Sequence, residues 1–191
     1  STDVVANQTL FNYSVNGQRS TTNNAHFASS HFYDDQGRLR EEIIKGPYEL
    51  APMLPVTFAV KYTHDSQQRE TSRQFTLAGS VDLTLENAYY ADGKLKSAQL
   101  KQGASVLGAR SLTYTPGGRL KACTTTGVWR PMTPTHENVD KQAFTYDALG
   151  NVLTCITTFG TVKNTATYTY DALNGYRLAK VVNSHGDYTA S

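Results

Sequence analysis

Long hydrophobic runs are missing from this sequence of 191 residues. Its apolar stretches are only a few residues long, whereas a transmembrane helix needs roughly 20, so we expect no membrane span. No charged and then apolar leader opens the chain. Because it begins with STDVV rather than methionine, we expect a fragment of a larger protein. The length predicts a single domain over residues 1–191, with a core of its own.

The sequence also lacks a large excess of charge of one sign. The 18 basic and 16 acidic residues are spread along the chain and leave a formal net charge of +2. No segment carries the dense positive stripe that neutralises a run of phosphates, which argues against nucleic acid as a partner. Hydrophobic residues make up 39% and charged residues 18%, below the usual globular averages, and the excess of Thr, Ser, Asn and Tyr suits strands and turns.

Clusters that hold metals or perform catalysis are missing as well. The two cysteines, Cys123 and Cys155, belong to no CxxC or Cys/His group, so the sequence predicts no sulfur-bound metal. The five histidines are dispersed: His26, His31, His64, His136 and His185. No GxSxG, phosphate-binding loop or dinucleotide fingerprint occurs. We therefore expect no metal, no cofactor and no enzymatic activity.

What the sequence does contain is a repeat, which must be recognised before any fold is assigned. Its unit is a tyrosine followed four residues later by glycine, then by a polar residue and an aliphatic one. Four clear copies are YDDQGRL, YYADGKL, YTPGGRL and YDALGNV; three weaker ones are YSVNGQR, YTHDSQQR, which lacks the glycine, and YDALNGYRL. They begin at Tyr13, Tyr33, Tyr62, Tyr89, Tyr114, Tyr146 and Tyr170. The spacing averages about 26 residues.

Each copy is predicted to be a β-hairpin. An apolar or aromatic residue stands two places before most of the tyrosines, which is the period of a strand. The Asp, Asn, Gly and Pro that follow favour a tight turn, and alternation then resumes. The aspartates after the tyrosine, Asp34, Asp147 and Asp171, are expected to cap the turns. Two strand spacings, about 9.6 Å, separate equivalent positions, which argues against a catalytic carboxylate pair.

The same strand spacing predicts whether the two cysteines can form a disulfide. Cys123 lies nine residues after Tyr114, and Cys155 nine residues after Tyr146. They therefore occupy the same place in neighbouring hairpins, at a distance beyond the roughly 7 Å limit for a disulfide. We expect two free, buried thiols.

Two proline-containing segments, 46–58 and 127–142, are predicted to be long connectors. The second carries Trp129 beside Arg130. Together with the cations after the turn glycines, Arg38, Lys94 and Arg119, these residues form the candidate ligand-binding set. The alternatives are that Trp129 folds its loop back onto the sheet and that the cations only solvate a strand edge. No helix of any length is predicted, so the fold class is all-β.

The hairpin unit resembles the YD or RHS repeat. FTYDALGNVLTC and YTYDALNGYRL carry the resemblance most clearly, and it extends from about Leu10 to Val182. In that family the strands spiral into a hollow shell, found in bacterial toxin complexes, polymorphic Rhs toxins and teneurins. The resemblance implies a long curved or spiralling sheet of about seven repeats, in a secreted or cell-surface bacterial virulence protein. The conserved DPxG-type core with its self-cleavage aspartates has no counterpart here, so no protease residue carries over.

Two functions are therefore expected. The first is a structural shell segment, whose partners are the remaining RHS shell and an encapsulated C-terminal domain. The alternative is a β-repeat module that binds carbohydrate or a cell-surface receptor through the candidate set. Because the ribbon has two open edges, we also expect it either to fold back as two layers or to associate edge to edge.

Overall fold

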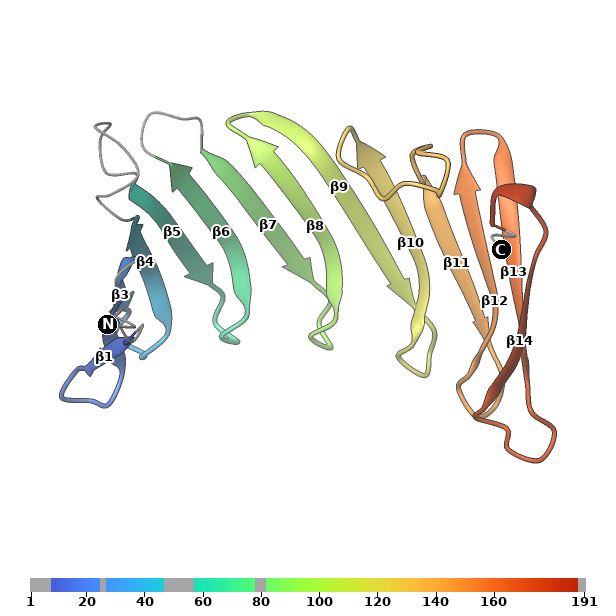
Figure 1. Cartoon of the computed structure of the whole chain (residues 1–191), viewed down its shortest axis with the longest axis horizontal. Helices are drawn as coiled ribbons and strands as arrows, with labels where there is room; N and C mark the ends of the chain where they lie inside the picture. Colours follow the sequence, from blue (N-terminus) through green and yellow to red (C-terminus); the bar gives the residue numbers. More distant parts are fainter. Residues whose placement is uncertain (1–7, 25–26, 47–56, 78–81, 189–191) are drawn as a thin grey trace, which may run out of the picture. The chain divides into compact units, whose positions relative to one another are not determined.

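The structure is a computed structural model that describes residues 8–24, 27–46, 57–77 and 82–188. Fourteen strands form one antiparallel sheet whose order follows the chain (Figure 1). The strands are β1 (Leu10–Tyr13), β2 (Arg19–Asn23), β3 (Ala28–Tyr33), β4 (Leu39–Lys45), β5 (Thr57–His64), β6 (Glu70–Leu77), β7 (Leu83–Tyr89), β8 (Leu95–Gln102), β9 (Ser105–Tyr114), β10 (Leu120–Gly127), β11 (Lys141–Tyr146), β12 (Val152–Phe159), β13 (Val162–Tyr170) and β14 (Leu178–Asn183). One short 3₁₀ turn, Gly186–Tyr188, follows β14. The predicted all-β hairpin fold is confirmed; the curvature of the whole ribbon stays a prediction.

The chain divides into two compact units, 1–87 with 101–105, and 88–100 with 106–191. We describe each unit by itself. The prediction of one domain stays a prediction. The predicted connector 46–58 lies mostly outside the described residues, and only its ends, Gly46, Thr57 and Phe58, are seen.

Every odd-numbered strand ends on the residue that begins a turn, and we call this residue the anchor. The anchors are Tyr13, Tyr33, His64, Tyr89, Tyr114, Tyr146 and Tyr170. Six of them are the predicted tyrosines. The third copy was aligned wrongly: His64, not Tyr62, ends β5, and Tyr62 lies two residues earlier. The error arose because Tyr62 matched the motif better than His64, while the turn that follows fixes the true register.

The turns after the first six anchors share one geometry, and the turn after Tyr170 is two residues longer. After Tyr33, the Gly37 N–H donates to the Asp34 carbonyl at 2.9 Å, and the Asp34 N–H donates to the Arg38 carbonyl at 2.9 Å. The glycine adopts φ +80°, as expected for a turn closed by a glycine bulge. After His64, Gln68 takes the glycine place with φ +64°. The turn after His64 therefore keeps the same backbone hydrogen bonds although glutamine replaces the glycine.

The core of unit 2 lies on the tyrosine-bearing face of β12 and β13. Phe159 is 3% exposed, and the rings of His185 and Tyr188 lie 5.4 and 6.1 Å from its ring. Asn164 beside it is buried and donates to the Asn183 side chain at 2.9 Å. The segment after β14 therefore folds back over this face of the sheet.

Both cysteines are free, as predicted. Cys155 is buried, whereas Cys123 is only half-buried, so the expectation of two buried thiols is wrong for Cys123. Burial raises the pKa of both thiols above their usual value. The sheet partner of Cys155 on β11 is Phe144, while Cys123 faces Gln142.

The segment between β10 and β11 is a compact loop rather than an extended connector. Met132 forms an isolated antiparallel bridge with Asn138, and a tight turn closes between them, with the His136 N–H donating to the Thr133 carbonyl at 3.0 Å. Val139 is 4% exposed. The prolines interrupt the sheet here, but backbone hydrogen bonds within the loop hold it together.

Candidate functional site

The anchor tyrosines connect consecutive hairpins through their hydroxyl groups. Each of four hydroxyls donates to a carbonyl oxygen at the start of the second strand of the preceding hairpin. The bonds run from Tyr33 to Arg19 at 2.9 Å, from Tyr114 to Leu95 at 2.9 Å, from Tyr146 to Leu120 at 2.6 Å and from Tyr170 to Val152 at 3.0 Å. Every acceptor lies six residues after the preceding anchor. We call this series the tyrosine ladder. It binds neighbouring hairpins at a point that the backbone pairing does not cover.

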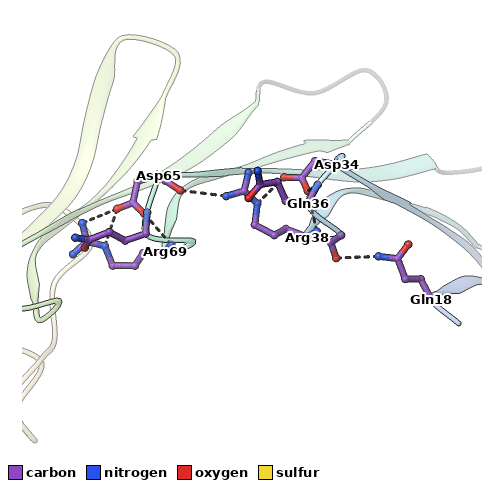
Figure 2. Close-up of polar contacts among 8 residues, drawn as sticks. Gln18, Asp34, Gln36, Arg38, Asp65 and Arg69 are labelled. Atoms are coloured by element: carbon purple, nitrogen blue, oxygen red, sulfur yellow. Dashed lines mark hydrogen bonds and ion pairs between the residues drawn. The ribbon is translucent and has the colours of Figure 1, made fainter. Parts of the chain in front are cut away.

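A second series of contacts joins consecutive turns, and in three copies it uses the side chain five residues after the anchor. In unit 1, Gln18 donates to the Gly37 carbonyl at 3.0 Å, and Arg38 donates to the Asp65 carbonyl at 3.2 Å. Figure 2 shows these side chains spanning from one turn to the next. In unit 2, Asn151 donates to the Gly175 carbonyl at 2.8 Å. A side-chain hydrogen-bond donor at this position therefore holds the next turn in place in these three copies.

The turn aspartates act as predicted caps. The Asp34 carboxylate accepts the backbone N–H groups of Gln36 and Arg38, each at 2.9 Å, and the Arg38 guanidinium at 2.7 Å (Figure 2). The Arg38 N–H and guanidinium lower the pKa of Asp34. Asp147 likewise accepts from Asn151, whose amide lowers the pKa of that carboxyl. Asp171 accepts backbone N–H groups of its own turn at 2.7 and 3.1 Å.

The three candidate turn cations are occupied by these contacts. Arg38 pairs with Asp34. Lys94 pairs with Asp92 and lies 5.8 Å from the centre of the Tyr114 ring. Arg119 lies 5.8 Å from the centre of the Tyr146 ring, in a cation–π contact with the next anchor. The structure therefore gives all three a stabilising role within the sheet; ligand binding by them stays a prediction.

Trp129 and Arg130 lie at the other end of β10 from the turn that contains Arg119. The Trp129 side chain is 59% exposed. Its backbone packs on β9, where the Leu107 carbonyl accepts the Trp129 N–H at 3.0 Å. Arg130 pairs with Asp140, whose second carboxylate oxygen accepts the Gly160 N–H at 2.7 Å. The loop is thus held to the sheet by its backbone, while the indole faces solvent.

Within unit 2, strand β10 separates Arg119 from Trp129 and Arg130 by its whole length. Arg38 lies in unit 1. In the ranges that the structure describes, no group of three or more His, Cys, Asp or Glu could hold a metal ion. Within the same ranges, no helix has the length and apolar character to cross a bilayer.

Sequence reasoning missed Gln18, Asn151 and the acceptors of the tyrosine ladder. One signal was available: the residue five places after the anchor is Gln, Arg, Arg, Lys, Arg or Asn in the first six copies. All can donate a hydrogen bond and none is an acid. This capacity, and not the positive charge that four of them carry, is their shared property.

No protein-family model and no curated protein matches this sequence. Solved structures do resemble it. The crystal structure of TcdB2-TccC3-TEV matches 92% of the chain with a TM-score of 0.71 at 17% identity. The chain has the fold of an RHS-repeat sheet. A Photorhabdus luminescens Tc holotoxin pore with a mutated TccC3 also matches 92% of it, at 12% identity and a TM-score of 0.44.

The match with a TM-score of 0.71 confirms, for the fold, the resemblance to RHS repeats inferred from the YD motifs. At 17% identity the likeness concerns architecture alone. The chain covers 9% of the TcdB2-TccC3-TEV chain and 12% of the holotoxin chain.

Proposed function

We propose that this chain is a wall segment of an RHS shell in a larger bacterial protein, and that the shell encloses a cargo domain. One observation carries the proposal: consecutive hairpins are joined outside their backbone pairing by the tyrosine ladder and by the turn-to-turn donors. Such links make a continuous wall from modules that cannot bury a face alone. The wall role also fits a chain to which we assign no catalytic function.

Partners and location follow from this role as parts of the proposal. The remaining RHS shell and an enclosed C-terminal domain would be the partners within the parent protein. The parent would be secreted or displayed at the cell surface of a bacterium.

The test uses the natural polypeptide that contains these residues, purified with an antibody raised against this chain. Cryo-electron microscopy should show a hollow particle with the antibody on its wall. Protease should leave an internal domain intact until mild denaturant opens the particle. A parent without an enclosed volume, or an enclosed domain digested as fast before opening as after it, contradicts the proposal.

A second candidate, binding of an acidic glycan, is favoured by one observation. Strands β8 to β14 contain Lys and Arg but no Asp or Glu. Lys141 and Lys163 each pair with Thr158 across β12, so they share one face, about 9.6 Å apart. Exposed Trp129 adds a stacking surface near β10.

Retention on a heparin column, measured against salt, tests this candidate. Lys141→Gln combined with Lys163→Gln should lower the eluting salt concentration. Lys61→Gln is the matched control, because Lys61 lies on β5 and faces Glu41 at 3.9 Å. Equal elution of wild type and the double variant excludes this face as the binding surface.

A further inference from the structure

Two Asn-Gly dipeptides occur in this sequence, Asn16–Gly17 and Asn174–Gly175. Both lie in turns that join the two strands of a hairpin, and both asparagines are exposed. An asparagine followed by glycine can react without an enzyme. The glycine nitrogen attacks the side-chain amide, and because glycine has no side chain, nothing hinders the approach. The two turns differ in the hydrogen bonds that surround the reacting atoms.

At the first pair, the attacking nitrogen is already bonded. The Gly17 N–H donates to the Ser14 carbonyl at 2.9 Å, and Gly17 adopts φ +75°. Attack on the Asn16 side chain would break this bond. Among the residues that the structure describes, no N–H group donates to the Asn16 side-chain oxygen. The first turn therefore opposes the reaction.

At the second pair, the nitrogen is not bonded and the target carbonyl is. The Gly175 N–H has no acceptor in the described part of the chain. The Tyr176 N–H donates to the Asn174 side-chain oxygen at 3.3 Å. Negative charge develops on this oxygen when the amide is attacked, and a donor placed there lowers the barrier. The second turn therefore favours the reaction.

A neighbouring hairpin would not change this difference. In the described junctions, the tyrosine ladder and the turn-to-turn contacts both direct side-chain donors at backbone carbonyl oxygens. A further hairpin of the parent protein, packed on β14 in the same way, would also supply donors. Such groups cannot accept the Gly175 N–H.

We propose that Asn174–Gly175 is a site of spontaneous deamidation, and that the reaction releases the contact between the turns after Tyr146 and Tyr170. The Gly175 nitrogen bonds to the side-chain carbonyl carbon of Asn174. Its proton passes to the departing side-chain nitrogen, which leaves as ammonia, and a succinimide ring remains. Water then opens the ring at either of its two carbonyls to give aspartate or isoaspartate. The net reaction consumes water and releases ammonia.

Isoaspartate is the main product expected. It forms when water attacks the main-chain carbonyl of Asn174, which accepts the Arg177 N–H at 2.9 Å. The bond to the side-chain carbonyl is longer, at 3.3 Å, so the main-chain carbonyl has the better donor for the charge that develops. In isoaspartate the backbone runs through the side chain and gains a methylene group before Gly175.

The longer backbone cannot fit without moving Gly175. A Cβ atom added to Gly175 would lie 3.1 Å from Leu149 Cδ1, so the preceding turn already packs closely on this residue. The Gly175 carbonyl accepts the Asn151 amide at 2.8 Å. Isoaspartate therefore displaces the acceptor of this turn-to-turn contact. The inference rests on the turn geometry and does not depend on whether the parent protein encloses a cargo.

The test follows both sites in the whole natural polypeptide that contains this chain. One sample is incubated folded and another in denaturant, both at mildly alkaline pH, and each is digested at acid pH, where the reaction is slow. Mass spectrometry measures the conversion of amide to acid in the peptides that carry Asn16 and Asn174. Electron-transfer fragmentation distinguishes isoaspartate from aspartate. The denatured sample is the matched control, because it keeps both sequences and removes both turns.

In the folded protein, we expect Asn174 to convert about tenfold faster than Asn16, the factor that one or two hydrogen bonds make to a barrier. Isoaspartate should be its main product. In denaturant, the two sites should convert at similar rates. Equal rates in the folded protein would overturn the site, and so would a folded Asn174 that stays unreacted although it converts in denaturant.

Hydrogen exchange tests the release of the contact. As isoaspartate accumulates, the backbone amides of the turn after Tyr146 should exchange faster in the folded parent protein. Asn174→Asp is the matched control, because its carboxylate still accepts the Tyr176 N–H and its backbone keeps the normal length. Unchanged exchange in the aged wild-type protein, or an equal increase in the freshly purified variant, refutes the release.

Discussion

Removing one hydroxyl of the tyrosine ladder should weaken the sheet by an amount that the structure defines. In Tyr146→Phe, the 2.6 Å bond to the Leu120 carbonyl is lost. The ring stays, and so does its contact with the Arg119 guanidinium at 5.8 Å. Because Tyr146 is half-buried, water can reach the freed carbonyl in part, and the cost should be that of one net hydrogen bond, about 1 kcal/mol. For a chain of this size, that cost lowers Tm by about 2–4 °C.

Trp129 makes the measurement specific, because it is the single tryptophan and lies in the same unit as Tyr146. Urea unfolding at 25 °C is followed by its fluorescence. Tyr176→Phe is the matched control: Tyr176 is 69% exposed and belongs to the last turn, so its hydroxyl should contribute close to nothing. If the free energies of unfolding of the two variants agree within about 0.3 kcal/mol, the ladder does not stabilise the sheet as a hydrogen bond should.

Three further outcomes are expected. His64→Tyr should raise the free energy of unfolding by about 0.5–1.5 kcal/mol, measured by urea titration, because it supplies the hydroxyl that the third anchor lacks; an unchanged value would contradict the ladder rule at this place. Gly108→Ala should cost about 1–3 kcal/mol and alter Trp129 emission, since the new methyl meets the Trp129 carbonyl oxygen; Gly117→Ala, where the nearest atom lies 3.8 Å away, should leave emission unchanged. The folded-state pKa of Asp147 is lowered, so its contribution is present above the unfolded pKa and is lost as pH falls through the folded pKa. Tm followed from pH 7 to acid should therefore fall less steeply for Asp147→Asn than for wild type, and parallel curves would contradict the capping role.

The sequence by itself determined the repeating unit. Alternation before each tyrosine, turn residues after it and a glycine at a fixed place specify a hairpin, because strand and turn preferences act over a few neighbouring residues. That information was enough to predict fourteen antiparallel strands, the aspartate caps and two unpaired cysteines. It was insufficient at His64, where the residue type misled the alignment although the turn kept its geometry.

Only the tertiary structure decided what the polar side chains do. The tyrosine hydroxyls and the donors five places after the anchors bind atoms 14 to 27 residues away in sequence, and a local pattern contains no information on which carbonyl lies within reach. The sequence suggested that Lys94 and Arg119 bind an external ligand. In the structure, each lies over the tyrosine ring of the next anchor, because the hairpins lie side by side. Distances between repeats depend on sheet register, which is set by all the pairings together, and so the links that join the hairpins became visible only once the strands had been placed side by side.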